Sequence, residues 1–316
     1  MNGPAVLAGY AADLVVGDPP RWHPVAGFGR VAIALEHLTY APTRARGAAF
    51  AAGLVAAAAL SAELLARSAP RGVVLAVVTW AALGGRSLRR EAEGIAGCLE
   101  RGDLDAARTG LRALCGRDAA ELSEGELCRA TVESVAENTS DAVVGALLWG
   151  ALAGPAGVAA YRAANTLDAM VGHRSERYLE FGWAAARLDD SLSWPAARTS
   201  VALTAMCAPV VGGSAREVVR IARRDGSAHP SPNAGQIEAA FAGALGVRLG
   251  GPLAYQGAVE HRPHLGAGAH PNAADIRRAT RLSLAVGAAA AALTAAVMNF
   301  YRMSTKIHHT PPGSPP

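Results

Sequence analysis

Two apolar runs of membrane-spanning length constrain the fold more than any other feature of this chain. A helix needs about 20 consecutive apolar residues to cross a bilayer, and Gly47–Ala66 meets that length with one acid, Glu63, near its end. Leu282–Tyr301 carries no charged residue. Because lipid offers an exposed backbone no hydrogen-bond partner, such runs cross it as helices. The two runs therefore predict helices embedded in a membrane.

The composition favours helices throughout. Hydrophobic residues make up 51% and charged residues 18% of the chain, whereas a soluble domain is about 25% charged. Runs of aromatic and β-branched residues, which strands prefer, are scarce. We therefore expect an all-α fold, a polytopic integral membrane helical bundle whose active-site segments are loop-rich and cytoplasmic. The expected organisation is a single membrane-embedded catalytic domain over residues 1–303 and a disordered C-terminal tail over residues 304–316.

Three weaker apolar segments complete the predicted bundle. Val73–Gly85 is short and suits the return leg of a hairpin, while Ala142–Tyr161 and Thr199–Gly213 are interrupted by glycine or proline. Arginines flank the first hairpin on both sides, which places both flanks in the cytoplasm by the positive-inside rule. A complete crossing by residues 142–161 would then separate the polar clusters across the bilayer. Gly154 and Pro155 suggest instead a re-entrant or broken helix buried in protein, which membranes tolerate.

The remaining segments are polar. Arg86–Arg129 is typical of one or two amphipathic helices, and Arg216–Arg281 of a region that is mostly loop, since it is rich in Pro, Gly, Asn and His. The cysteines form no CxxC pair, so we expect buried free thiols and no structural zinc site. Lys306 is the only lysine, which excludes a Walker-type phosphate loop. No basic stripe appears, so no nucleic-acid partner is expected.

Acidic and amide residues gather around the interrupted apolar run. Glu133, Glu137 and Asp141 are spaced four residues apart, which places them on one face of a helix about 12 Å long. A solvated helix face explains such a stripe as well as a site does, although Asp141 directly precedes the apolar run. Asn165 and Asp168 lie one helical turn apart and suit a metal or a substrate hydroxyl, or else a cross-link between helices.

A second polar block combines arginines with adjacent aspartates. Arg174, Arg177 and Arg187 lie close in sequence to Asp189 and Asp190. Guanidinium groups bind phosphate through paired hydrogen bonds, and Mg²⁺ is usually held by one or two carboxylates plus substrate phosphates. The block is therefore typical of phosphoryl chemistry, with a structural Arg–Asp network as the alternative.

Two short motifs add candidate substrate contacts. Asp18 and His23 flank a proline-rich helix exit, which exposes an acid and an imidazole close together. Ser231, Asn233 and Glu238 belong to a turn that leads into a helix N-terminus, where backbone N–H groups attract anions. A lone histidine and a tight turn are also common structural features, so neither motif assigns a function alone.

Taken together, these blocks resemble the CbiB/CobD family of cobalamin biosynthesis, the adenosylcobinamide-phosphate synthases. Each matching motif is modest, but the ordered set is specific and runs from residue 13 to beyond residue 250. The matching stretches are Asp13–Pro24 (DLVVGDPPRWHP), Glu137–Asp141 (ENTSD), Ala164–Gly172 (ANTLDAMVG), Arg177–Arg198 (RYLEFGWAAARLDDSLSWPAAR) and His229–Gly251 (HPSPNAGQIEAAFAGALGVRLGG).

The resemblance implies a multi-pass enzyme of the cytoplasmic membrane with an active site that faces the cytoplasm. Such an enzyme joins adenosylcobyric acid to (R)-1-aminopropan-2-ol or its O-phosphate through an amide, with ATP as cosubstrate and Mg²⁺ as cofactor. Because a carboxylate is a poor acyl donor, an amide-forming ligase first activates it, and an acyl phosphate is the expected intermediate. The implied partners are the corrinoid and the amine, the lipid bilayer, and a second copy of the chain or other late cobalamin-pathway proteins.

The resemblance marks positions, and the chemistry of their side chains suggests roles. Asp189 and Asp190 are expected to bind Mg²⁺, and Arg177 and Arg187 to bind phosphate. The residues expected to be catalytic are Glu137, Asp141, Asp168 and Asp190. The residues expected to bind substrate are Asp18, His23, Asn138, Asn165, Arg177, Arg187, Ser231, Asn233 and Glu238.

Two other functions remain open from the sequence. A membrane transporter for a small polar or anionic solute also has apolar segments with polar breaks around a midplane site, although the polar motifs here occupy loops more than span centres. A membrane phosphotransferase acting on a lipid alcohol would need several aspartates at regular helical spacing, which Asp189–Asp190 does not supply.

Overall fold

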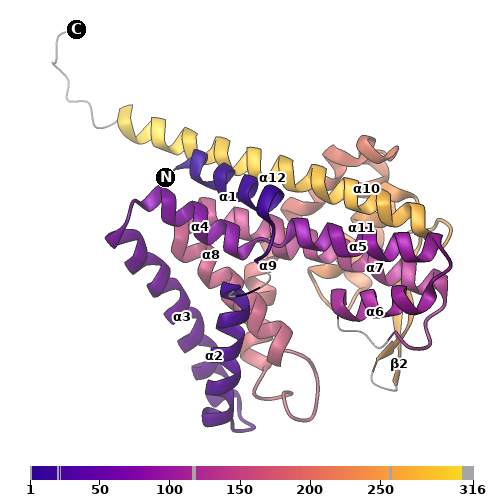
Figure 1. Cartoon of the computed structure of the whole chain (residues 1–316), viewed down its shortest axis with the longest axis horizontal. Coiled ribbons are helices and arrows are strands. Elements are labelled where there is room, and N and C mark those ends of the chain that lie inside the picture. Colours follow the sequence, from indigo (N-terminus) through magenta and orange to yellow (C-terminus); the bar gives the residue numbers. More distant parts are fainter. Residues whose placement is uncertain (1, 20, 22, 116–118, 256–257, 308–316) are drawn as a thin grey trace.

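The computed structural model describes residues 2–19, 21, 23–115, 119–255 and 258–307, and helices dominate it (Figure 1). Within these residues, β1 and β2 pair as an antiparallel hairpin. The elements are α1 (Gly3–Val16), α2 (Pro24–Thr39), α3 (Arg44–Ser68), α4 (Arg71–Ala82), α5 (Gly85–Glu100), α6 (Leu104–Cys115), α7 (Glu124–Thr139), η1 (Ser140–Val144), α8 (Gly145–Val171), α9 (Trp183–Cys207), η2 (Ala208–Val211), α10 (Ala215–Asp225), η3 (Gly226–Ala228), α11 (Ala234–Leu245), β1 (Leu249–Tyr255), β2 (Ala258–Leu265) and α12 (Ala273–Ile307).

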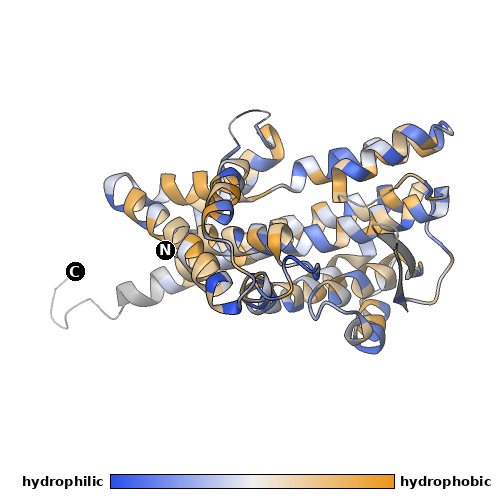
Figure 2. Ribbon diagram, turned by 90° about the horizontal axis from the view of Figure 1, so that it is seen from below, coloured by the Kyte–Doolittle hydropathy of each residue, from blue (hydrophilic) through white to orange (hydrophobic). Residues whose placement is uncertain are grey.

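Three stretches are long and apolar enough to cross a membrane, namely Arg44–Ser68, Glu124–Val171 and Ala273–Tyr301. Figure 2 shows that apolar residues concentrate toward the end of the molecule where the N-terminus lies, while the opposite end is mixed or polar. Large apolar side chains are exposed on several helices, including Leu38 on α2 and Phe300 on α12. Lipid solvates such a surface, whereas water would drive it to associate. The expected all-α membrane fold is confirmed, with one short β-hairpin among the described residues.

The chain reverses direction inside α8. Gly154 has φ 63° and ψ −150°, a conformation that is essentially restricted to glycine, and Pro155 follows it. In a straight helix Gly145 and Tyr161 would lie about 24 Å apart, yet a methyl group added at Gly145 would overlap the Tyr161 hydroxyl. The two arms on either side of Gly154 therefore pack against each other as a helical hairpin. The prediction of a broken helix is confirmed.

This reversal brings the polar residues before and after the apolar run to the same end of the hairpin. Asp141 lies in η1, just before the first arm, and Asp168 lies near the end of the second arm. Their carboxylates are close enough to repel each other. Both acids therefore lie at one end of the hairpin, as a single site requires.

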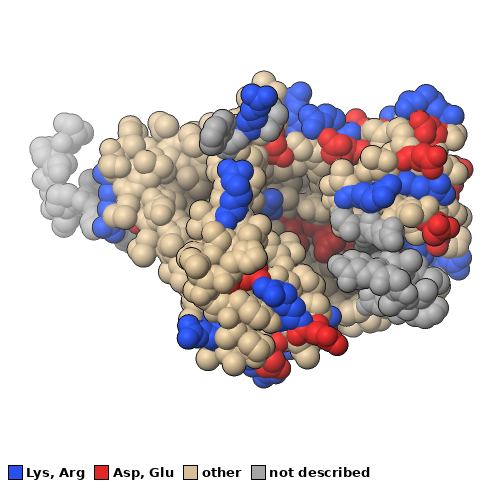
Figure 3. Space-filling model, turned by 60° about the horizontal axis from the view of Figure 1, so that its bottom comes forward, with Lys and Arg blue, Asp and Glu red and all other residues tan. Residues whose placement is uncertain are grey.

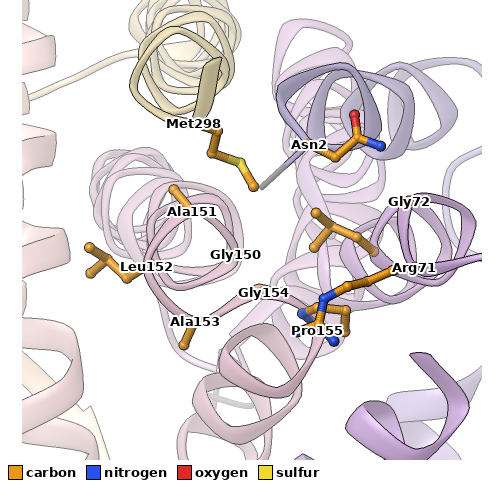
Figure 4. A pocket seen from close by; sticks show the side chains of 11 residues that line it. Asn2, Arg71, Gly72, Gly150, Ala151, Leu152, Ala153, Gly154, Pro155 and Met298 are labelled. Atoms are coloured by element: carbon orange, nitrogen blue, oxygen red, sulfur yellow. The ribbon is translucent and has the colours of Figure 1, made fainter. Parts of the chain in front are cut away.

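The tip of the hairpin borders a separate cavity. Gly150–Pro155 and Arg71 line this space of about 490 Å³, and Figure 4 shows the Arg71 side chain extending toward Gly154 and Pro155. The Arg71 guanidinium donates hydrogen bonds of 2.8 and 3.1 Å to the Glu63 carboxylate. The Arg71 charge in this cavity is thus already paired, and the cavity lies at the opposite end of the hairpin from Asp141 and Asp168.

We expect cysteines placed singly at positions 173 and 232 to react with a membrane-impermeant maleimide from the same side of the membrane. His173 and Pro232 are exposed and border one cleft at the open end of the hairpin. The measurement uses vesicles of both orientations and a variant whose native cysteines are replaced by serine. A cysteine at Ser68, at the opposite end of α3 from the cleft, should label from the other side. Labelling of positions 173 and 232 from opposite faces would contradict this arrangement.

The region 216–281 differs from its prediction, because it is largely helical and not mostly loop. It holds most of α10, all of α11, the β-hairpin and the start of α12. α11 is rich in alanine and glycine and is buried along almost its whole length. A side chain at Gly243 would collide with the backbone of α10 at Glu217. The glycines of α11 permit close packing of helices. The prediction of a loop was wrong because it took a high glycine content as a sign of turns.

The other boundaries agree more closely with the sequence. The predicted amphipathic helices in 86–129 are α5, α6 and the start of α7, and the predicted return leg at 73–85 corresponds to α4. α12 continues to Ile307, so residues 304–307 are helical and do not belong to a tail. Residues 308–316 lie outside the described part of the chain. The single catalytic domain stays a prediction.

Candidate active site

Four carboxylates from four consecutive elements converge at the open end of the α8 hairpin. Glu137 comes from α7, Asp141 from η1, Asp168 from α8 and Asp189 from α9. Their negative charges act on one another. Figure 3 shows acidic side chains at the floor of a hollow in the middle of the molecular face. The structure therefore brings together, from distant points of the sequence, the carboxylates expected to be functional. We call these four residues the acid cluster.

Glu133 shares the predicted stripe but has a different environment. Its Oε1 accepts a hydrogen bond of 2.9 Å from the backbone N–H of Gly250 at the start of β1. Arg129 Nε lies 3.9 Å from the same oxygen, and Arg129 Nη1 donates to the Gly250 carbonyl at 2.6 Å. Glu133 and Arg129 are both buried. This pair fastens the β-hairpin to α7, so the stripe divides into a structural acid and two acids of the cluster.

Replacing Glu133 with glutamine is expected to lower the thermal unfolding temperature of the detergent-solubilised protein. The change removes the Glu133 charge that faces the buried Arg129 guanidinium, and breaking a buried pair costs about 3 kcal/mol or more. Glu217→Gln is the matched control, because Glu217 pairs with Arg220 on the exposed face of α10 and exposed pairs contribute little. An unchanged unfolding temperature for Glu133→Gln would contradict the anchoring role.

A hydrogen-bond network holds Asp189 in place. Asn165 Nδ2 donates to Asp189 Oδ1 at 3.3 Å, and the Ser193 hydroxyl donates to the same oxygen at 3.3 Å. Tyr161, buried between the hairpin arms, has its hydroxyl 3.4 Å from Ser193 Oγ. Burial raises the pKa of Asp189 to about 6, against the opposing effect of the two hydrogen bonds and with a further rise from Asp190 and Glu137. A cation near Asp189 would relieve this accumulated negative charge.

The sequence analysis did not identify Arg162, which is the positive charge at the centre of this arrangement. Its Nη1 donates to Asn165 Oδ1 at 3.1 Å, and its guanidinium interacts electrostatically with Asp141, Asp18 and Asp189. Arg162 thus orients the amide that holds Asp189 and offsets part of the acid cluster's charge. A charged residue inside an apolar helix is costly and usually functional, and that signal was available in the sequence.

Asp190 points away from its neighbour in sequence. Consecutive residues on a helix do not face each other, and the Asp190 carboxylate lies 3.6 Å from Arg187 Nη1, on the solvent side of α9. Burial raises the pKa of Asp190, while Arg187 and Arg174 lower it. Within the described ranges, no three His, Cys, Asp or Glu side chains are grouped as a metal site. The predicted Mg²⁺ ligands Asp189 and Asp190 therefore face different partners, Asn165 and Arg187, and their metal-binding role stays a prediction.

Asp18 and His23 lie together, as the sequence predicted. His23 Nδ1 accepts a hydrogen bond of 3.2 Å from the backbone N–H of Val25, which caps α2. In a neutral ring the proton is then on Nε2, which lies 3.4 Å from Asp18 Oδ1. Since the charge of Asp18 reaches Arg162, this pair lies beside the acid cluster. Its predicted substrate contact stays a prediction.

The motif before α11 connects that helix to α9. Asn233 Nδ2 donates to the backbone carbonyl of Asp190 at 2.8 Å, and Arg198 Nη1 donates to Asn233 Oδ1 at 2.6 Å. The Ser231 hydroxyl oxygen accepts from the backbone N–H of Asn233 and Ala234, at 3.3 and 3.1 Å. These contacts position the α11 N-terminus next to Asp190. The side chains of Ser231 and Asn233 are occupied in doing so.

Two further predicted residues have local contacts of their own. Glu238 is buried in α11. Asn138 Nδ2 donates to the Ser134 carbonyl at 3.0 Å, within α7. For both residues the predicted substrate contact stays a prediction.

Arg177 is engaged elsewhere. Its Nη2 lies 2.9 Å from Glu36 Oε1, and its guanidinium stacks 4.1 Å from the centre of the Tyr40 ring. The Tyr178 hydroxyl donates to the same Glu36 oxygen at 2.8 Å. These contacts fasten the segment between α8 and α9 to the end of α2. The predicted phosphate contact of Arg177 stays a prediction, whereas Arg187 faces Asp190 and remains exposed.

Comparison with known proteins identifies the family. The family model described as CobD/Cbib protein matches residues 6–283. The chain is 54% identical over 300 residues to "Cobalamin biosynthesis protein CobD" of Mycobacterium tuberculosis, covering 94% of this chain and 95% of the relative. The proteins of the same name from Chromobacterium violaceum and Rhodobacter capsulatus are 46% and 39% identical, over 85% and 89% of this chain and 88% and 93% of their own lengths. No solved structure matches. The chain belongs to the CobD/Cbib family.

Proposed function

We propose that this protein is a cobalamin biosynthesis enzyme of the membrane. In this proposal it forms the amide between adenosylcobyric acid and (R)-1-aminopropan-2-ol or its O-phosphate, which gives adenosylcobinamide or its phosphate. The relatives named for cobalamin biosynthesis cover nearly the whole chain, which supports the pathway. The acid cluster supports a reaction that brings an ammonium group and a metal ion to a carboxyl group.

The observation that carries the proposal is the convergence of Glu137, Asp141, Asp168 and Asp189 at one end of the α8 hairpin. Like charges this close are costly, and such clusters are typical of functional sites. An amine substrate arrives as an ammonium ion, which the carboxylates attract. It must lose a proton before it attacks an acyl carbon, and Glu137 and Asp141 are the carboxylates that we assign to binding it and accepting that proton.

Mg²⁺ prefers carboxylate oxygens, and this preference supports a Mg²⁺ ion as part of the proposal. Asp189 and Asp190 are the residues that would hold it, with phosphate oxygens of a substrate completing the shell. Bound there, the ion would neutralise charge on a transferring phosphoryl group. Asp189 is oriented for this by Asn165 and Ser193. ATP is the phosphoryl donor that we propose, since a carboxylate needs activation before an amine displaces its oxygen.

The hollow with the acid cluster is the proposed entry for the corrinoid. The ring system is too large for a buried pocket, so only its carboxylate arm needs to reach Asp168. Arg162 lies next to the acids and reduces the repulsion that an incoming carboxylate meets. We assign this end of the hairpin to the cytoplasmic face, because arginines border the helices there and positive charge favours that side.

Purified full-length protein in lipid nanodiscs tests the proposal. It is incubated with adenosylcobyric acid, ATP, Mg²⁺ and either aminopropanol or its O-phosphate, and the products are identified by mass spectrometry. We expect a new amide with one or both amines, dependent on ATP and abolished by EDTA. Absence of the amide with both amines would reject the activity, and amide formation in EDTA would reject the role of Mg²⁺.

A further inference from the structure

A cleft of about 460 Å³ lies beside Asp190, between the segment 172–182, α9 and the turn before α11. Its wall includes two carboxylates, Glu180 and Asp190, and a group of basic and aromatic side chains around them. These are Arg44, His173, Arg174, Trp183 and Arg187. Three guanidinium groups against two carboxylates leave the cleft with a positive excess, whereas the acid cluster on the inner side of α9 is negative.

Arg174 and Arg187 are the arginines available to a ligand. Within the part of the chain that the structure describes, the Arg174 side chain has no hydrogen bond or ion pair, and its charge acts on Asp190. Arg187 has one long contact, 3.6 Å to Asp190, and its side chain is 66% exposed. By contrast, Arg44 is paired with Glu180 at 2.8 Å. Two guanidinium groups are therefore free to turn into the cleft.

The backbone that carries Arg174 is held at several points. Arg177 and Tyr178 both bond to Glu36 on α2, and the Tyr40 hydroxyl donates to the Arg177 carbonyl at 2.8 Å. At its far end, a side chain at Gly47 of α3 would collide with the backbone of Phe181, so the segment lies directly on that helix. Because the segment that carries Arg174 is already fixed, binding of a ligand to Arg174 costs little backbone entropy.

We propose that this cleft binds the phosphate group of a substrate, with Arg174 and Arg187 as its ligands. Guanidinium forks match phosphate oxygens in charge and geometry, and the α11 N-terminus near Asp190 adds partial positive charge. Asp190 lines the cleft, and its charge also acts on Asp168 and Asp189, so the cleft lies next to the acid cluster. This inference rests on the proposed function, and it holds for a nucleoside triphosphate and for the O-phosphate of the amine, which share the same group.

Equilibrium binding to full-length protein in nanodiscs tests the cleft. The probes are a non-hydrolysable ATP analogue and aminopropanol O-phosphate, with unphosphorylated aminopropanol for comparison. Arg174→Gln and Arg187→Gln are each expected to raise the Kd of a phosphate-bearing probe by about 10-fold, as the loss of a charge-assisted hydrogen bond does. Neither variant should change the Kd of aminopropanol. Arg223→Gln on α10 is the matched control, because Arg223 is also an exposed arginine but lies outside the cleft.

The outcomes separate the source of the phosphate from the existence of the site. If the variants raise the Kd of the ATP analogue alone, the cleft binds the nucleotide. If they raise the Kd of aminopropanol O-phosphate alone, the cleft binds the amine substrate. Unchanged affinity for both phosphate probes in both variants overturns the inference, even if the native protein makes the amide. Conversely, the native protein could make no amide while the variants bind the phosphate probes more weakly. That result would support the phosphate site and reject the proposed function.

Discussion

Asp190→Ala is expected to lower kcat for amide formation by about 10²–10³-fold, the loss seen when one electrostatic contact to a transition state is removed. Asp190 lies between the arginine-lined cleft and the acid cluster, within 3.6 Å of Arg187 and near enough to Asp168 for their charges to repel. In the proposed reaction its carboxylate would hold a cation between a phosphate on one side and the reacting carboxyl group on the other. Assays of the purified variant over a range of Mg²⁺ concentrations measure the effect.

The fold should survive this change. Asn233 bonds to the backbone carbonyl of Asp190 and not to its side chain, so alanine leaves the link between α9 and α11 intact. Asp105→Ala provides the matched control, because the Asp105 side chain is 94% exposed and pairs with Arg108 on the surface of α6. If Asp190→Ala kept full activity with the native Mg²⁺ dependence, Asp190 would have no part in the chemistry.

Gly172→Ala is expected to reduce kcat by about 10²-fold, since a 1 Å misplacement of a reacting group can have that effect. A methyl group at Gly172 would overlap Asp168 Oδ1 and come within 2.7 Å of the Asp168 backbone oxygen. The backbone of Gly172 has φ −78°, which any residue adopts. The consequence is therefore steric: the Asp168 carboxylate must leave its place in the acid cluster.

The same substitution elsewhere separates this effect from a general glycine effect. Gly94 lies inside α5 with open space around it, and alanine there should be neutral or slightly stabilising. Activity and thermal unfolding of both variants are compared. Native kcat in Gly172→Ala would show that the position of the Asp168 carboxylate does not matter for the reaction.

Some parts of the site followed directly from sequence patterns. The spacing of Asn165 and Asp168 placed them one turn apart on one face of a regular helix. Asn165 accordingly bonds to Asp189, and Asp168 belongs to the same acid cluster. The pairing of Asp18 with His23 needed only a short, proline-rich connection. Residues close in sequence are positioned by local backbone geometry, and sequence patterns predict that geometry directly.

Other parts depended on contacts between distant segments. Four-residue spacing grouped Glu133 with Glu137, but Glu133 bonds to Gly250, which no helical periodicity indicates. From the sequence, Arg177 and Arg187 were equally good candidates for binding phosphate. In the structure, Glu36 and Tyr40 contact the Arg177 guanidinium. Tertiary packing determines which partner an arginine contacts. Arg177 and Glu36 are more than a hundred residues apart in the sequence, so no local pattern indicates their contact.

The sequence by itself determined that this chain has helices suited to lipid, and it contained the acidic, amide and arginine motifs of its family. Apolar length and residue identity are enough for those conclusions, because the bilayer and the chemistry of side chains impose them without reference to neighbours. Only the tertiary structure decided which of these groups meet. The reversal at Gly154 brings Asp141 to Asp168, and the packing of α9 adds Asp189. Electrostatic interaction depends on distance in space, and that distance is set by how the helices fold back on one another.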